Sequence, residues 1–321
     1  MGKIKLLLNV GTCYSATTPL QYTVTLDNRY VHNGHTKEHH YLYGLYAEKE
    51  NVQDFREIKD ELVMRGEDIV KKRNESNRLA YLEKMKSKDY REKHKPVSLS
   101  MWSKYIKFNG EDFFLKDLTL QRYIDYLLEH YSYIKDDFVG VGDFSNSLAK
   151  LPKKFISEIS TKLLENFDVK VTMIFRDPVR RLFSTANRAS QCIGHRDPVN
   201  LVKLWVKGSM EENVYYSTIY KNWSSVFGEE NVHMIVMEEF SAGNVESLSK
   251  FLDFPIKKPH ENVYYPDMGV NAPRYDYLYD QWRSDIVMLD DDLYKYLYKR
   301  MSFVYDEFRQ TFGYIPEAWM K

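Results

Sequence analysis

Four short runs of mainly apolar residues lie along the chain, and each is followed by turn or capping residues and then by a helical pattern. The runs are Ile4–Val10, Phe138–Gly142, Val169–Phe175 and Val232–Met237. Short apolar runs rich in β-branched residues are typical of strands covered on both faces, as in a parallel sheet. The pattern therefore predicts four buried parallel strands.

Between these runs, apolar residues recur at helical spacing. One such face combines Phe155, Ile156, Ile159, Leu163 and Leu164. The predicted helices are Leu115–His130, Phe155–Phe167, Pro178–Ala189 and Val214–Phe227. Alternating strands and helices predict an α/β fold with a doubly wound parallel sheet flanked by helices. Ligands of such sheets bind beyond the carboxyl ends of the strands.

One long segment breaks this pattern. From Glu48 to Lys95, 26 of 48 residues are charged, which predicts a charged helical insertion over residues 48–97. Within it, Lys71–Lys95 has ten basic and four acidic residues, so it forms either a solvated helical face or a wall that attracts an anionic acceptor. The tyrosine-rich Tyr275–Phe312 is predicted to be helical and to serve packing. We find no repeats or interdomain linker and predict a single domain, 1–321.

The charge balance narrows the possible partners. Lys and Arg number 46, as do Asp and Glu, so any anion site must be local, and a general nucleic-acid binder is disfavoured. Two cysteines are too few for a disulfide scaffold, which fits a reducing compartment. Ile4–Val10 is too short to span a bilayer. We therefore expect a soluble, cytoplasmic protein that binds neither membranes nor nucleic acids.

The first candidate anion site is the segment Gly11–Leu20, which follows the first predicted strand. Pro19 suits the first helical position and Thr18 the N-cap, so hydroxyls and free backbone N–H groups gather at a helix N-terminus. Such an end attracts phosphate or sulfate, although Ser and Thr also occur there merely as caps. The Gly-Lys-Ser/Thr ending of a Walker A loop is absent, which disfavours an ATP or GTP hydrolase.

The second candidate follows the third predicted strand. Asp177 can cap the helix that Pro178 opens, which leaves Arg176 at the carboxyl end of the strand. Ser184 shares a helix face with Arg180, Arg181, Asn187 and Arg188. A strand-end arginine with a helical serine suits a phosphate monoester. An arginine-rich amphipathic helix without a ligand is the alternative interpretation.

Together the two segments resemble the cofactor motifs of sulfotransferases that use 3′-phosphoadenosine 5′-phosphosulfate (PAPS). The resemblance lies in a strand followed by Gly-Thr-x-x-Ser-x-Thr-Thr and a later strand followed by Arg-Asp-Pro-x-x-Arg-x-x-Ser. Further segments are similar to the Golgi-type and bacterial carbohydrate branch, namely Val141–Ser145, Tyr216–Leu252 and Val270–Arg274. The resemblance covers most of residues 4–20 and 139–275 and implies a P-loop-like fold.

The resemblance implies a role for each matching residue. Ser15, Thr17 and Thr18 would hold the 5′-phosphosulfate, and Arg176 with Ser184 the 3′-phosphate. The implied cofactor-binding residues are Thr12, Cys13, Tyr14, Ser15, Ala16, Thr17, Thr18, Arg176, Ser184 and Arg274. Two separate anion sites suit a nucleotide phosphorylated at both ends better than they suit NAD or ATP.

A catalytic base is implied by a shorter match. Thr36–Leu42 resembles the Lys-Glu-x-His-Phe-Phe stretch of heparan-type enzymes, whose glutamate is the base. Glu38 then takes the base role, Lys37 lies near substrate or phosphosulfate, and His40 orients the site or substitutes as base. Alternatively, Glu38 is an ordinary surface carboxylate. His32, His35, His39 and His40 also have spacings compatible with zinc, but Gly34 argues against one continuous helix.

Two departures from the family pattern bear on catalysis. Tyr14 stands where the family has Lys or Arg, and Phe144 replaces the lysine of its Gly-Glu-Lys segment. Losing one stabiliser of developing charge typically costs about a hundred- to a thousand-fold in rate. Lys37, Arg180 and Arg274 are the candidate substitutes. Ala16 in place of a glycine is a milder change.

The sequence thus predicts a PAPS-dependent sulfotransferase, of bacterial or viral origin, that acts on a hydroxyl or, less readily, an amine. The acceptor is expected to be a glycan or a small hydroxylated molecule, and the product nucleotide adenosine 3′,5′-bisphosphate. One alternative is a catalytically silent relative that binds the nucleotide or a glycan. Another is a nucleotide kinase with an unusual phosphate loop, which would need ATP and magnesium.

Overall fold

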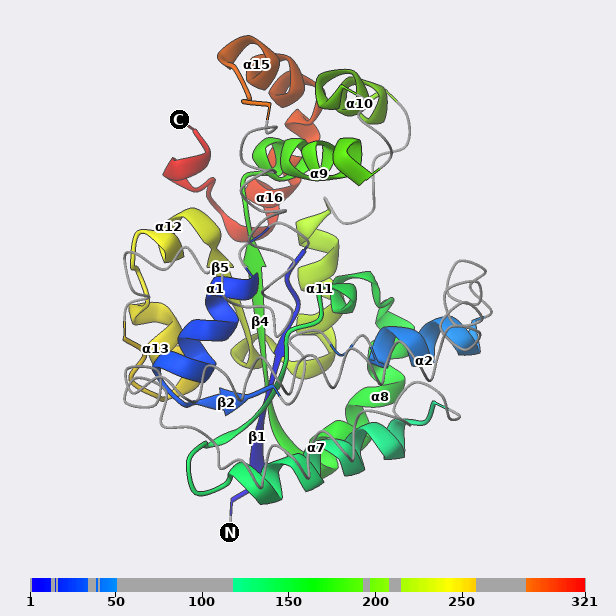
Figure 1. The fold of residues 1–321 in the computed structure, drawn as a ribbon, viewed down its shortest axis with the longest axis vertical. Coiled ribbons are helices and arrows are strands. Elements are labelled where there is room, and N and C mark those ends of the chain that lie inside the picture. Colours follow the sequence, from blue (N-terminus) through cyan, green and yellow to red (C-terminus); the bar gives the residue numbers. More distant parts are fainter. Residues whose placement is uncertain are drawn as a thin grey trace.

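A single parallel sheet organises the part of the chain that the structure covers. The structure is a computed structural model that describes residues 2–12, 15, 17–33, 39, 41–50, 118–192, 197–207, 215–257 and 287–320. Within these residues, five strands pair in the order β2-β3-β1-β4-β5, and every pairing is parallel (Figure 1). The strands are β1 (Ile4–Asn9), β2 (Val31–His32), β3 (Gly140–Asp143), β4 (Phe167–Phe175) and β5 (Val232–Val236).

The apolar runs are continuous because helices cover both faces of the sheet. Alternate β1 side chains enter different cores: Leu6 and Leu8 belong to one buried cluster and Leu7 to the other. All three are fully buried. The four predicted strands and the α/β fold class are confirmed. The strand β2 was not predicted, because two residues at a sheet edge form no recognisable run.

The first core lies under helices that pack on one face of the sheet, and the second core lies under shorter helices on the other face (Figure 1). On the first face lie α7 (Leu120–Ile134), α8 (Lys153–Asn166) and α11 (Tyr216–Phe227). On the second face lie α1 (Thr17–Tyr22), α12 (Met237–Ser241) and α13 (Glu246–Leu252). The helix α2 (Tyr41–Lys49) packs against α7.

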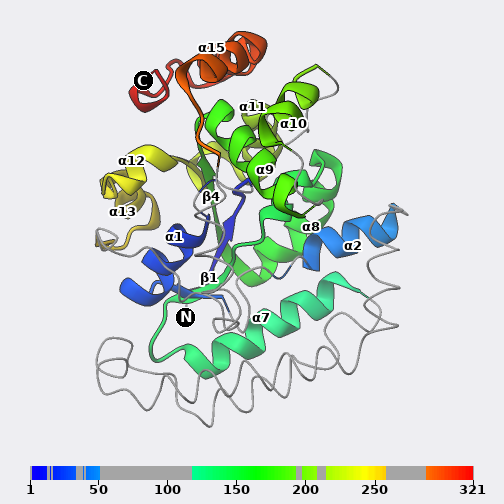
Figure 2. The same ribbon diagram turned by 45° about the horizontal axis from the view of Figure 1, so that its top comes forward.

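A third group of helices lies beyond the carboxyl ends of the strands. Its members are α9 (Pro178–Cys192), α10 (Pro198–Trp205), α15 (Asp291–Arg300) and α16 (Ser302–Phe312). Figures 1 and 2 show α9 across the end of β4, with α15 beyond α9 at the same end of the molecule. Single turns of other types are the π-helical η1 (Thr23–Asp27) and the 3₁₀ turns η2 (Asn146–Lys150), η4 (Glu229–Asn231) and η5 (Glu317–Trp319).

The predicted helices exist, with shifted ends. The N-cap prediction for Thr18 is wrong, because α1 begins at Thr17. Pro19 then lies in the first turn, where its missing N–H costs no helical hydrogen bond. Leu164, one of the apolar positions of the predicted helix Phe155–Phe167, is 39% exposed. The insertion 48–97 beyond residue 50 and residues 275–286 lie outside the described residues.

No helix among the described residues is both long and apolar enough to cross a lipid bilayer.

Candidate functional site

The two predicted anion-binding segments leave neighbouring strands. β1 and β4 pair with Asn9 opposite Thr172, and the first loop then runs beside the last residues of β4, where a Cβ atom at Gly11 would lie 2.8 Å from the Ile174 side chain. In the first loop the Thr12 and Ser15 hydroxyls are buried and lie 2.7 Å apart. Gly11 is required there, because a Cβ atom would lie 2.2 Å from the Thr17 methyl carbon. The sequence therefore folds this loop tightly against the start of α1.

The second segment forms the arrangement expected from its sequence. The Asp177 carboxylate accepts a hydrogen bond from the Arg180 backbone N–H at 2.8 Å and so caps α9. Arg176, at the end of β4, donates from Nη1 to the Ser184 hydroxyl at 2.9 Å. Burial lowers the pKa of Arg176, and the charges of Glu238 and Asp177 oppose this shift. One guanidinium and one hydroxyl thus converge as a polar fork.

This fork opens into a cavity of about 710 Å³. Ligand pockets of about 300–1,000 Å³ hold molecules of drug or nucleotide size. Arg176, Arg180 and Lys295 give the cavity three cationic side chains, with Asp291 as an acidic one. The other lining residues are Phe183, Ser184, Asn187, Val287, Met288, Leu289, Tyr294, Tyr298, Trp319 and Met320. The cavity therefore favours an anionic ligand with an apolar, stackable part.

Tyr216 of α11 joins the two loops. Its ring stacks on Phe175 with centroids 4.3 Å apart, and its hydroxyl donates to the Arg176 carbonyl at 2.8 Å. Burial raises the pKa of Tyr216 to about 12, and the nearby Thr12 side chain opposes this shift. The first loop and the strand-end arginine are thus held together from the core side.

Arg181 was not among the predicted binding residues. Its side chain is fully buried, and its Nε, Nη1 and Nη2 atoms have no hydrogen-bond partner in the described part of the chain. The signal in the sequence was its place as the second arginine of Arg-Asp-Pro-x-x-Arg-x-x-Ser. Arg180, one of the candidate substitute cations, instead lies 5.8 Å from the centre of the Tyr294 ring, on the cavity side.

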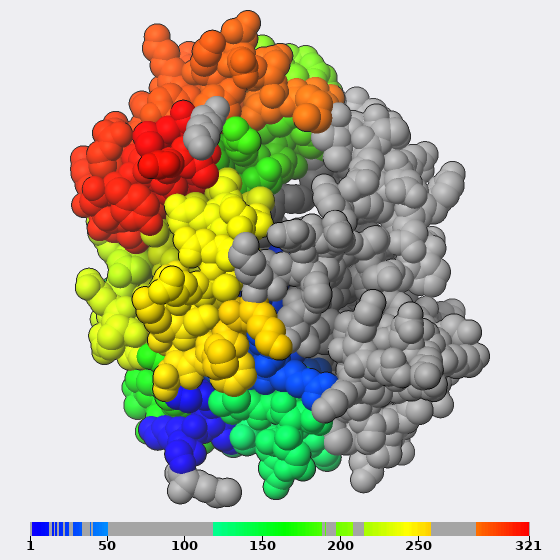
Figure 3. Space-filling model, turned by 90° about the vertical axis from the view of Figure 1, so that its left-hand side faces the viewer, coloured from blue at the N-terminus to red at the C-terminus, as the bar shows by residue number. Residues whose placement is uncertain are grey.

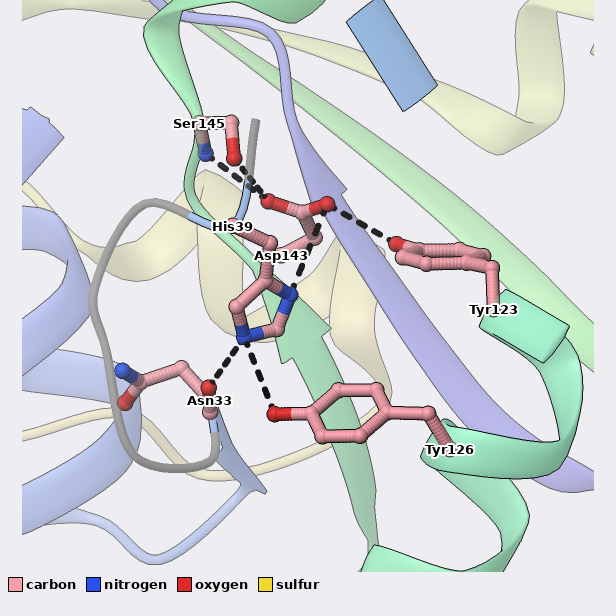
Figure 4. Close-up of polar contacts among 6 residues, drawn as sticks. All are labelled: Asn33, His39, Tyr123, Tyr126, Asp143 and Ser145. Carbon is pink, nitrogen blue, oxygen red and sulfur yellow. Dashed lines mark hydrogen bonds and ion pairs between the residues drawn. The ribbon is translucent and has the colours of Figure 1, made fainter. Parts of the chain in front are cut away.

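A second polar cluster lies at the end of β3 (Figure 4). Asp143 is fully buried; it accepts hydrogen bonds from Tyr123 at 2.8 Å and from the Ser145 backbone N–H at 3.0 Å. His39 Nδ1 lies 3.7 Å from the Asp143 carboxylate, and Nε2 donates to the Asn33 carbonyl at 2.6 Å. Burial by itself would raise the pKa of Asp143, but His39 and these hydrogen bonds lower it to about 2. His39, next to the predicted base Glu38, is therefore anchored in the core.

Several predicted site residues lie outside the described residues. They are the catalytic Lys37, Glu38 and His40 and the cofactor-binding Cys13, Tyr14, Ala16 and Arg274. Of the zinc candidates, His35 and His40 lie outside them as well, while His32 Nδ1 is 2.9 Å from His130 Nε2. No group of three or more His, Cys, Asp or Glu side chains in the described ranges is placed to hold a metal ion.

Comparison with solved structures defines the fold around this site. A sulfotransferase from Alicyclobacillus acidocaldarius aligns over 100% of both chains, with 13% identity and a TM-score of 0.50. This chain has a sulfotransferase-like fold. The sulfotransferase domain from the curacin biosynthetic pathway has 15% identity and a TM-score of 0.45, with 94% of this chain and 98% of that chain aligned. A Mycobacterium avium sulfotransferase has 13% identity and a TM-score of 0.37, with 95% of this chain and 77% of that chain aligned. No protein-family model and no curated protein sequence matches the chain.

Proposed function

We propose that the protein transfers a sulfuryl group from PAPS to a hydroxyl, or less readily an amine, of a carbohydrate or related acceptor. The observation that carries this proposal is the pairing of Arg176 with Ser184 beside the Thr12–Ser15 loop, at the carboxyl ends of adjacent strands. Two anion sites next to each other suit a nucleotide that is phosphorylated at its 3′ and 5′ positions. The sulfotransferase-like fold and the motif resemblance support the same donor.

The residues present fit such a donor. Arg176 and Ser184 would hold the 3′-phosphate, and the cavity next to them has room and aromatic walls for an adenosine. Thr12 and Ser15, with the backbone N–H groups at the start of α1, would hold the 5′ end. The donor supplies an activated sulfuryl group, so the protein's own part is to position it and to move one proton.

Glu38 is the proposed base. The acceptor oxygen bonds to sulfur while the bond from sulfur to the phosphate oxygen breaks, and Glu38 takes the acceptor's proton. Adenosine 3′,5′-bisphosphate is then the leaving group. The proposal is supported by the position of His39, which follows Glu38 directly and is fixed by Asp143 and Asn33. A segment anchored in this way can hold a neighbouring carboxylate in place.

The first test separates binding from chemistry. Titration calorimetry with adenosine 3′,5′-bisphosphate should show binding by the wild type and weaker binding by Arg176→Ala, by about ten- to a hundred-fold, because a charge-assisted contact is lost. Glu38→Gln should retain binding yet show no transfer of labelled sulfate from PAPS to a panel of sugars. Arg309→Ala is the matched control, because this arginine is exposed on α16. Absence of bisphosphate binding by the wild type would remove the proposed function.

A catalytically silent binding protein is the second candidate, favoured by one observation. Phe144 is fully buried in the core with Leu7 and Val31, so the residue that replaces the lysine of similar enzymes contributes no charge to the site. Such a protein would bind adenosine 3′,5′-bisphosphate but transfer no sulfate from PAPS to any acceptor. The transfer assay above therefore separates the two functions, once binding is demonstrated.

A further inference from the structure

Arg181 carries a buried positive charge that the described chain does not neutralise. Its side chain is fully buried, and all three guanidinium nitrogens lack a hydrogen-bond partner among the described residues. An arginine cannot become neutral in a protein, so its charge persists at any physiological pH. An uncompensated buried charge is strongly unfavourable, and an unsatisfied group of this kind calls for an explanation.

The nearby carboxylates are already engaged elsewhere. Asp177 accepts from the Arg180 backbone N–H and from the Tyr294 and Tyr305 hydroxyls. Glu238 accepts from the Asp177 backbone N–H at 3.0 Å and from the Trp319 indole at 2.9 Å. Neither forms an ion pair with Arg181 in the described structure. Neither carboxylate therefore neutralises Arg181 through an ion pair in this part of the structure.

Arg181 lies in the first turns of α9, just beyond the end of β4, where its backbone N–H donates to the Asp177 carbonyl at 2.9 Å. Its charge acts on the Tyr216 hydroxyl, where it opposes the rise in the pKa of Tyr216 that burial causes. That hydroxyl donates to the Arg176 carbonyl at 2.8 Å, and the Thr12 side chain also lowers its pKa. Arg176 and Arg180 are engaged on the cavity side, with Ser184 and with the Tyr294 ring. Of these three arginines, Arg181 is the one whose charge acts on the hydroxyl that donates to the Arg176 carbonyl.

We propose that Arg181 binds the phosphate or sulfonate oxygens of the group held in the first loop, at the 5′ end of the nucleotide. This inference rests on the proposed function and adds a residue to it. A guanidinium presents paired N–H donors that match two oxygens of a phosphate or sulfonate. Arg181 then supplies positive charge in a chain whose sequence has Tyr14 and Phe144 in place of the cationic residues of similar enzymes.

The test uses nucleotides that carry a phosphate at one end only. Binding of adenosine 5′-phosphate and adenosine 3′-phosphate is measured by calorimetry for the wild type, Arg181→Met and Arg176→Ala. Arg181→Met should weaken binding of the 5′-phosphate about ten- to a hundred-fold and leave the 3′-phosphate unchanged. Arg176→Ala should weaken binding of the 3′-phosphate by a similar factor and leave binding of the 5′-phosphate unchanged. Arg309→Met, on the exposed face of α16, is the control and should change neither.

A stability measurement gives an independent readout. Without nucleotide, Arg181→Met should unfold at the same or a higher temperature than the wild type, because it removes an unpaired buried charge without opening a large cavity. Added adenosine 3′,5′-bisphosphate should then stabilise the variant much less than it stabilises the wild type. A lower melting temperature without nucleotide would instead show that the arginine has an internal partner, and would overturn the inference.

The outcomes distinguish this inference from the proposed function. Unchanged 5′-phosphate binding by Arg181→Met, or an equal loss for both nucleotides, overturns the role of Arg181 while leaving the function intact. If the methionine variant does not fold, Arg181→Lys keeps the charge and should lose several-fold in 5′-phosphate binding alone. An equal loss of affinity for both nucleotides in Arg181→Lys also overturns the role of Arg181. Failure of the wild type to bind the bisphosphate rejects the proposed function itself.

Discussion

The ionisation state of Asp143 is determined by a few contacts with its neighbours. Its carboxylate is completely buried, and burial alone disfavours a charge there. His39, Ser145 and Tyr123 provide enough positive charge and hydrogen bonding to lower its pKa to about 2 instead. Because the folded pKa is below the ordinary value of 3.8, this group stabilises the fold above about pH 4. The stabilisation is lost as the pH falls toward 2.

Replacement of this residue gives a pH-dependent prediction. Asp143→Asn should lower the free energy of unfolding at pH 6 by about 3 kcal/mol, because it breaks a buried charged pair. It should also lose less stability than the wild type between pH 4 and pH 2, because the titrating group is gone. Urea denaturation over this pH range measures both effects. Asp306→Asn, an exposed carboxylate on α16, is the control, and parallel pH curves for wild type and Asp143→Asn would contradict the assignment.

In the same cluster, the sequence predicted the strand-end segment but not the contact between its polar side chains. The sequence identified Val141–Ser145 as a strand-end segment and Phe144 as a departure from the lysine of similar proteins. It did not indicate that the Asp143 carboxylate lies close to His39, because the two residues are far apart in the chain and only tertiary packing brings them together. Phe144, in contrast, behaves as an apolar residue of a buried strand end is expected to behave.

The strands depend on close backbone approach as much as on apolar runs. Gly140 starts β3 opposite Lys5 of β1, and a Cβ atom at Gly140 would lie 2.1 Å from the Lys5 carbonyl oxygen. That oxygen is main chain and cannot swing away as a side chain would. The predicted strand began at Phe138, but the pairing with β1 starts only where the glycine allows it.

Gly140→Ala is therefore expected to be far more damaging than an ordinary surface change. The added methyl group must separate β3 from β1, and it should lower the free energy of unfolding by about 2 kcal/mol or more. Equilibrium urea denaturation followed by circular dichroism measures this loss. Gly2→Ala is the matched control, because nothing lies within 4 Å of its Cβ position. Equal stability of the two variants would show that β1 and β3 do not approach so closely.

Among the helices, α9 was the most predictable and α1 the least. Asp177 caps α9 as its sequence indicates, because a capping carboxylate and the N–H groups it binds are close neighbours in the chain. The start of α1 was placed two residues late, since Pro19 is allowed anywhere in a first turn. Local signals thus locate helices well but leave their first residue open.

In the whole molecule, the C-terminal helices are tied to the strand-end motif. The Tyr294 and Tyr305 hydroxyls donate to the same Asp177 oxygen at 2.9 and 3.0 Å, and Trp319 donates to Glu238 of α12. Figure 3 shows the red C-terminal segment against the yellow segment that contains α12. One wall of the cavity, which includes Tyr294 and Trp319, is therefore supplied by the end of the chain.

Tyr305→Phe tests this connection. Loss of a buried hydroxyl from Asp177 should lower the free energy of unfolding by about 1–2 kcal/mol. Asp177→Asn and the double variant complete a cycle, and the two effects should not add, because both residues share one hydrogen bond. Tyr314→Phe, on the exposed end of the chain, is the control. Additive effects measured by urea denaturation would mean that α16 packs without this bond.

The sequence by itself determined the elements and their order: apolar runs for buried strands, helical spacing between them, and capped turns where the two anion-binding loops leave the sheet. These features follow from interactions among residues a few positions apart, so they can be read from a linear pattern. The tertiary structure alone decided which polar groups meet in the interior. Arg181 with Tyr216, His39 with Asp143 and the C-terminal tyrosines with Asp177 are distant in the chain, and only the packing of helices around the sheet brings them together.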